Sequence, residues 1–125
     1  MSENEIATLV VDAVYRIHKN LGPGLLESAY ETVLAYELVR CGLRVLRQHP
    51  IGLVYDERHM GDGFRADLIV EGKVILEIKS VEALAPVHKK QLLTCLRLAN
   101  KRLGLLINFN VELIGDGIVR VVNGL

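Results

Sequence analysis

The stretch FRADLIVEGKVILEIKS, residues 64–80, most strongly constrains the fold of this 125-residue chain. Polar and apolar residues alternate on both sides of Glu71-Gly72-Lys73, which predicts two antiparallel strands joined by a short loop. A three-residue loop sets Val70 opposite Val74, whereas a strict two-residue turn would bring the wrong faces of the strands together. The pattern therefore predicts a hairpin with the longer loop or a bulge.

This register divides the hairpin into an apolar face and a charged face. The apolar face is expected to gather Ala66, Leu68, Val70, Val74, Leu76 and Ile78. On the other face Asp67 lies opposite Glu77, and Arg65 lies opposite Lys79. Like charges opposed on neighbouring strands destabilise a sheet, by on the order of 4 kcal/mol at about 4 Å and an effective dielectric of about 20.

Two explanations of the carboxylate pair remain open from the residues alone. A divalent cation would remove the repulsion, and hard oxygen ligands suit Mg²⁺ or Mn²⁺. Lys79 would then orient a water or stabilise charge developing on a phosphate. Alternatively, Arg65 and Lys79 simply pair with Asp67 and Glu77 on a solvated face, and charge alternation by itself favours this second explanation.

The rest of the chain predicts helices before and after the strands. Apolar residues recur at helical spacing over 6–21, and Gly22-Pro23-Gly24 separates that helix from a second one over 25–41, which Gly42 ends. A third helix is expected over 87–102, ending near Gly104. β-rich runs cover 44–49, 51–57, 64–70, 74–80 and 103–109, with 118–122 as an optional last strand.

These elements predict one domain over residues 1–125, of α/β (α+β) class, with helices packed on the faces of a central sheet. The order is α-α-β-β-β-α-β. Half of the residues are hydrophobic, which supplies a real core and argues against disorder. Cys41 and Cys95 match no zinc or CxxC spacing and are expected to be buried free thiols. The acidic start of the chain and the absence of a long apolar run predict a cytoplasmic protein without membrane contact.

Charge is balanced overall, with 15 basic and 15 acidic residues, so net charge predicts no polyanionic partner. Residues 83–111, however, contain no acidic residue. The basic side chains there are Lys89, Lys90, Arg97, Lys101 and Arg102. They form either a local surface for a phosphate backbone or an ordinary solvated helix face.

Three features together resemble a known family. Gly24, Glu27 and Tyr30 give G-L-L-E-S-A-Y, Asp67 precedes Glu77-Ile78-Lys79 by one hairpin to give D…ExK, and Gln91 falls in the following helix. With the element order, the chain resembles the PD-(D/E)xK nuclease superfamily, and specifically the small bacterial GxxExxY proteins. The resemblance covers nearly the whole chain and implies a restriction-endonuclease-like core with a central mixed sheet. Ala66 stands before Asp67, where the family pattern has a proline.

The resemblance implies a role for each matching residue. Asp67 and Glu77 would be ligands of Mg²⁺ or Mn²⁺, with the Ile78 carbonyl as a further ligand. Lys79 would assist the attacking water or the transition state, and Glu27 would be an accessory ligand or hold a metal-bound water. Gln91 would position a ligand or a substrate phosphate.

Other interpretations stay open for two residues of the second helix. Glu27 is also explained as a first-turn carboxylate that gains roughly 0.3–1 kcal/mol from the helix dipole. The question is whether it lies within one water of Asp67 and Glu77. Tyr30 is either a buried tyrosine with a bonded hydroxyl or a further nucleic-acid contact.

The function expected from these features is metal-dependent hydrolysis of phosphodiester bonds in nucleic acid, DNA more than RNA. Two alternatives are a catalytically inactive binding or regulatory module on the same fold, and a dimeric nuclease that resolves Holliday-type junctions. The last alternative requires a homodimer.

Overall fold

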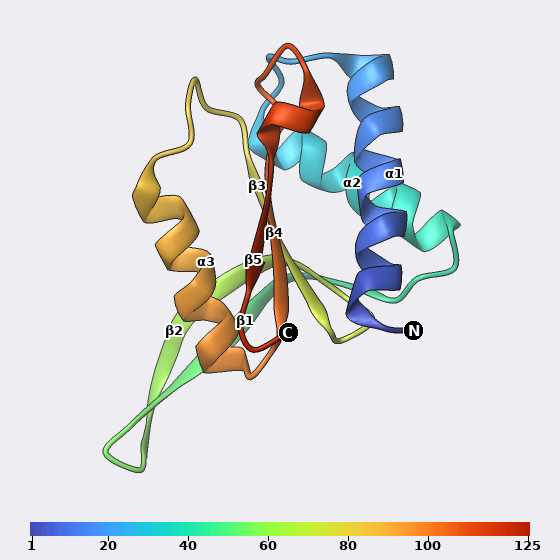
Figure 1. Ribbon diagram of the computed structural model, residues 1–125. Helices are drawn as coiled ribbons and strands as arrows, with labels where there is room; N and C mark the ends of the chain where they lie inside the picture. The colour runs from blue at the N-terminus through green and yellow to red at the C-terminus, as the bar shows by residue number, and fades with distance from the viewer.

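The computed structural model describes all residues from Met1 to Leu125. Figure 1 shows a five-stranded sheet with helices on both faces. The elements are α1 (Glu3–Leu21), α2 (Glu27–Arg40), β1 (Val45–Tyr55), β2 (Arg58–Val70), β3 (Val74–Lys79), α3 (Pro86–Ala99), β4 (Leu103–Asn108), the 3₁₀ turn η1 (Ile114–Gly117) and β5 (Ile118–Val122). The predicted order is confirmed, and the optional last strand is β5.

The helices begin and end where local sequence signals place them. At the start of α1 the Ser2 hydroxyl accepts a hydrogen bond from the Glu5 N–H (3.2 Å), and the Glu5 carboxylate accepts one from the Ser2 N–H (3.1 Å). After α2, Gly42 adopts a φ of 86°, and the Leu43 N–H donates back to the Leu38 carbonyl. Gly42 therefore ends α2 as predicted.

The sheet is mixed, with strand order β1-β2-β3-β4-β5. All neighbouring strands are antiparallel except β3 and β4, which are parallel and connected through α3. One face packs against α1 and α2 around Ile6, Val10, Leu34, Leu38, Leu68 and Leu76. The other face packs against α3 around Ile69, Ile75, Leu92, Cys95, Leu96 and Leu106. The carboxyl ends of β3 and β4 consequently lie side by side.

Several predicted boundaries were wrong. The runs 44–49 and 51–57 form one strand, β1, because β1 is an edge strand and an edge tolerates the missing N–H of Pro50. α3 ends at Ala99, where Asn100 takes the left-handed conformation with φ 54°, and Gly104 lies inside β4. None of the helices combines the length and the hydropathy that a bilayer-spanning segment needs.

The β1–β2 hairpin extends beyond the other strands, as Figure 1 shows at the lower left. β2 pairs with β3 only from Leu68 to Val70, so the part of β2 from Arg58 to Asp67 pairs with β1 alone. At this point β2 also changes the face that it presents. Ala66 packs on the α3 side, whereas Leu68 packs on the side of α1 and α2.

The expectation that Ala66 shares a face with Leu68 was therefore wrong. Gln48, in the paired strand β1, has a left-handed φ of 47° beside this point. The Gln48 conformation and the separation of β2 from β3 interrupt the simple alternation on which the prediction depended. Asp67 lies at this interruption.

Candidate functional site

The Asp67 and Glu77 carboxylates lie where β2 and β3 separate. Val70 pairs with Val74, which confirms the three-residue loop, and the last backbone pair is Leu68 with Leu76. Beyond it, the Asp67 N–H donates to Glu77 Oε1 (3.2 Å), and the Ile78 N–H donates to Asp67 Oδ2 (2.8 Å). Beyond the last backbone pair, each carboxylate thus accepts a hydrogen bond from a backbone N–H of the opposite strand.

Burial controls the acidity of this pair. The Glu77 side chain is largely buried, which raises its pKa to about 8, with the neighbouring Asp67 charge as the second cause. Burial also raises the pKa of Asp67, while the hydrogen bond from the Ile78 N–H opposes that change. The fold therefore holds together two carboxyls that resist being ionised at the same time, and a bound cation would relieve that repulsion.

The donor chemistry of the pair fits a hard divalent cation that keeps part of its water shell. Mg²⁺ is commonly bound through one or two carboxylates plus waters, and Asp67 and Glu77 supply two. No group of three or more His, Cys, Asp and Glu side chains is arranged to hold a metal ion. The pair therefore fits partial coordination by the protein rather than a complete protein cage.

Lys79 follows Glu77 by two residues on β3 and is half-buried. Its ammonium group forms no ion pair, and its charge slightly opposes the rise in the Glu77 pKa. The expected opposition of Arg65 and Lys79 was wrong, because Arg65 pairs with Pro50 of β1 after β2 has left β3. Lys79 is therefore a cation near the carboxylates that no neighbouring acid neutralises.

Glu27 contacts the residue that directly follows β3. Its Oε2 accepts a hydrogen bond from the Ser80 N–H (3.3 Å), and the Ser80 hydroxyl donates to the Leu25 carbonyl (2.6 Å). Glu27, Ser80 and Asn110 line a pocket at the start of α2. The first turn of α2 is thereby joined to the residue that directly follows Lys79.

A family model described as the PD-(D/E)XK nuclease superfamily matches residues 4–121, nearly the whole chain. The chain belongs to the PD-(D/E)XK nuclease superfamily. This confirms the superfamily and the restriction-endonuclease-like fold, α+β with three helices and a five-stranded mixed sheet. No curated protein and no solved structure matches the chain. The narrower GxxExxY group stays a prediction.

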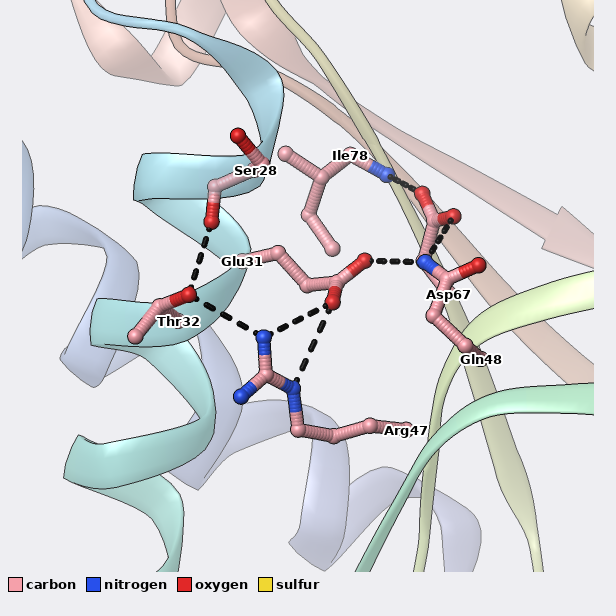
Figure 2. Close-up of polar contacts among 7 residues, drawn as sticks. All are labelled: Ser28, Glu31, Thr32, Arg47, Gln48, Asp67 and Ile78. Carbon is pink, nitrogen blue, oxygen red and sulfur yellow. Dashed lines mark hydrogen bonds and ion pairs between the residues drawn. The ribbon is translucent and has the colours of Figure 1, made fainter.

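Glu31 is a residue of this candidate site that the sequence interpretation missed. It is buried in α2, and Gln48 Nε2 donates to its Oε1 and also to Asp67 Oδ1 (3.2 Å), as Figure 2 shows. Arg47 holds the other oxygen of Glu31 through Nε (3.3 Å) and a terminal nitrogen (3.0 Å). Its spacing of four residues from Glu27 on the same helix face was the signal available in the sequence.

Gln91 and Tyr30 also form no hydrogen bond to Asp67, Glu77, Glu31 or Gln48. Gln91 is exposed on α3, one turn before the buried Cys95, whose pKa is raised to about 12 by burial and by the Glu77 charge. Gln91 therefore lies on the same stripe of α3 as Cys95, exposed and without a side-chain hydrogen bond. Tyr30 is fully buried, stacks on Phe109 with ring centroids 4.3 Å apart, and donates its hydroxyl to the Gly22 carbonyl.

These positions decide two sequence expectations. Tyr30 takes the first of its two interpretations, a buried tyrosine with a bonded hydroxyl, and its ring fills the core beside Phe109 with no exposed surface for nucleic acid. Cys41 is exposed at the end of α2, and only Cys95 is buried. Both cysteines are free thiols, as predicted.

The five basic side chains of segment 83–111 differ in how free they are to contact a phosphate backbone. Lys89, Lys90 and Arg97 are exposed on α3, and Lys101 follows the helix half-buried. Lys90 and Arg97 are seven residues apart and so share the outward stripe of α3, opposite its buried face. Arg102 is instead held against the chain end, because its guanidinium donates twice to the Gly124 carbonyl (3.3 and 3.1 Å).

Proposed function

We propose that this chain is a metal-dependent nuclease that hydrolyses phosphodiester bonds in nucleic acid. The observation that supports it is the Asp67–Glu77 pair, held by backbone N–H groups where β2 leaves β3, with Lys79 unpaired beside it. A structural protein would gain stability by replacing such a pair with neutral residues. Its presence in a member of a nuclease superfamily favours a catalytic role.

Each residue has a distinct task in this proposal. Asp67 and Glu77 hold the cation, with the Ile78 carbonyl as a further oxygen donor. When bound, Mg²⁺ or Mn²⁺ supplies a Lewis acid that polarises the phosphate and makes water a stronger nucleophile. The Lys79 ammonium stabilises negative charge as it develops on the phosphate oxygens. Glu27 orients water at the end of β3, and Gln91 donates to a phosphate from α3.

Nucleic acid is the substrate that the surface favours. Lys90 and Arg97 form the exposed basic stripe of α3, the helix that packs behind Glu77. Lysine and arginine on such a stripe contact the phosphate backbone without reading sequence. DNA is the proposed substrate ahead of RNA, and a homodimer is the form in which a four-way junction would be cut symmetrically.

The test is cleavage of duplex DNA, single-stranded RNA and a four-way junction by the purified chain with Mg²⁺ or Mn²⁺. Glu77→Gln and Lys79→Met are each expected to lower the rate by about 100-fold or more, because the first removes a carboxylate that holds the cation and the second removes the ammonium that stabilises charge on the phosphate. Glu82→Gln and Lys19→Met change exposed side chains without hydrogen bonds and should leave the rate unchanged. Equal rates in Glu77→Gln and the unmodified chain would reject the proposal.

A second candidate is a nuclease-fold module that binds nucleic acid without cleaving it. It is favoured by the hydrogen bonds on Asp67, because Gln48 uses one of the two lone pairs of Oδ1 and the Ile78 N–H uses one of Oδ2, which leaves fewer acceptor sites for a cation. Calorimetric titration with Mg²⁺ and Mn²⁺ separates the two candidates. No heat of binding, together with retained affinity for DNA, would support the module.

A further inference from the structure

A continuous set of hydrogen bonds connects α2 to Asp67 through strand β1. The two N–H groups of the Gln48 amide serve two carboxylates, Glu31 on one side and Asp67 on the other. Figure 2 shows the Gln48 amide between these two acids, with the Ile78 N–H on the far side of Asp67. We call the contact of Gln48 with both acids the Glu31–Gln48 bridge.

The Glu31 carboxylate, at the α2 end of this bridge, is held in place by further hydrogen bonds. Arg47 donates two hydrogen bonds to Glu31 Oε2, and the same guanidinium donates to the Thr32 hydroxyl (3.0 Å). The Thr32 hydroxyl in turn donates to the Ser28 carbonyl, one turn earlier in α2 (2.9 Å). A buried carboxylate with this many donors has little freedom to rotate, so Glu31 is a rigid acceptor for the Gln48 amide.

The backbone of Gln48 is strained where it forms the bridge. Its φ of 47° lies in the left-handed region, which costs free energy for any residue with a Cβ. Such conformations persist where the surrounding structure enforces them, and they concentrate at functional sites. A glycine would occupy this backbone without strain but would provide no amide. The strain therefore points to a requirement for the Gln48 side chain itself.

We propose that Gln48, anchored by Glu31, is a positioning residue that fixes the Asp67 carboxylate for cation binding. The inference rests on the proposed nuclease function. Each carboxylate oxygen has two lone pairs, so the bond from Gln48 to Oδ1 orients the group and still leaves it able to coordinate. Gln48 touches neither cation nor substrate in this role. It acts on Asp67 in the way that outer partners orient metal ligands in other proteins.

The test compares Gln48→Met, which keeps the length of the side chain and removes the amide, with Gln48→Gly, which also removes the backbone strain. His49→Met is the matched control, since His49 is the next residue of β1 and its side chain forms no hydrogen bond. Mn²⁺ affinity is measured by calorimetry, melting temperature by circular dichroism, and cleavage as separate kcat and KM values.

Both Gln48 variants are expected to lose about 10- to 100-fold in Mn²⁺ affinity and in kcat, with KM for nucleic acid unchanged. Gln48→Gly should melt no lower than Gln48→Met, because it relieves the left-handed φ. A purely structural bridge would lower the melting temperature and leave Mn²⁺ affinity and kcat unchanged. If Gln48→Met does not fold, the Mn²⁺ affinity and kcat of Gln48→Gly alone test the positioning role.

The outcomes separate this inference from the proposed function. If the unmodified chain and the Gln48 variants bind Mn²⁺ and cleave equally well, the positioning role is wrong and the nuclease function stands. If the unmodified chain neither binds Mn²⁺ nor cleaves, both the nuclease function and the positioning role are wrong. Loss of Mn²⁺ affinity in both Gln48 variants, but not in His49→Met, supports the inference.

Discussion

At the scale of single residues, burial raises the pKa of both Glu77 and Asp67, so the two neighbouring carboxyls resist being ionised together. β3 buries Glu77 beside Asp67, and the pKa of Glu77 rises to about 8 as a result. Near neutral pH and without a cation, Glu77 is therefore mostly protonated, whereas an exposed glutamate is ionised. The burial that makes the pair costly in the free protein also makes it receptive to a positive ion.

The stability of the cation-free protein is expected to fall as pH rises from about 5 to about 8. The Glu77 pKa is 4.5 when unperturbed and about 8 in the folded chain, so in this interval the folded state binds more protons. The stabilisation that the Glu77 proton gives to the folded state is complete below pH 4.5 and is lost as pH rises through 8. A single titrating group changes the free energy of unfolding by at most about 1.4 kcal/mol per pH unit.

Urea unfolding in EDTA at several pH values measures this effect. Glu77→Gln should flatten the pH dependence and be more stable than the unmodified chain at pH about 8, because it never ionises. Glu82→Gln, which changes an exposed carboxylate, should keep the original slope. The same slope in Glu77→Gln as in the unmodified chain would show that Glu77 is not the titrating group.

At the scale of elements, the end of β4 fixes the segment that follows Lys79. The buried Asn108 side chain donates to the Val81 carbonyl (2.9 Å) and accepts from the Val81 N–H (3.1 Å), which imitates strand pairing beyond the end of β3. Gly117 lies against this point. A Cβ at Gly117 would come within 2.1 Å of the Asn108 carbonyl oxygen.

Gly117→Ala is therefore expected to be destabilising by about 1–3 kcal/mol, since the backbone of β4 must move to accept the new methyl group. Gly52→Ala is the matched control, because nothing lies within 4 Å of a Cβ at Gly52 and its φ is not left-handed. The free energy of unfolding in urea compares the two. Equal stabilities would contradict the close contact between η1 and β4.

Local sequence signals were sufficient for elements whose partners are close in the chain. The loop at Glu71-Gly72-Lys73 and the opposition of Val70 and Val74 followed from alternation alone, and the structure confirms them. The face of Ala66 did not, because it depends on the left-handed Gln48, which lies 18 positions earlier in the chain. The alternation of residues along one strand does not indicate how a neighbouring strand distorts it.

The candidate site was predictable to the same extent. Asp67 and Glu77 are neighbours because one hairpin carries both. Glu31 was missed because its role depends on Arg47 and Gln48, which approach it only when α2 packs beside β1. The spacing of four residues from Glu27 places Glu31 on the same helix face, but that spacing does not indicate its contacts with Arg47 and Gln48.

At the scale of the whole molecule, the basic stripe of α3 is expected to set the salt dependence of nucleic-acid binding. Replacing Lys90 and Arg97 by glutamine should weaken binding to all sequences alike. It should also reduce the slope of log K against log salt concentration by roughly 2, one for each lost phosphate contact.

Fluorescence anisotropy with labelled duplex DNA measures this slope, in a Glu77→Gln background that prevents cleavage. Lys19 and Lys73 are the matched control pair, because Lys19 belongs to α1 and Lys73 contacts Met1 at the start of that helix. Their replacement by glutamine should leave the slope unchanged. A larger change in the control pair than in Lys90 and Arg97 would place the nucleic acid on another face.

The most direct test is a crystal structure of the full chain soaked in Mn²⁺, with the ion located by its anomalous scattering. The expected result is one Mn²⁺ bound by a carboxylate oxygen of Asp67 and one of Glu77, and no Mn²⁺ in a Glu77→Gln crystal treated identically. An Mn²⁺ elsewhere on the chain, or none at saturating concentration, would contradict a metal-dependent site at the separation of β2 and β3.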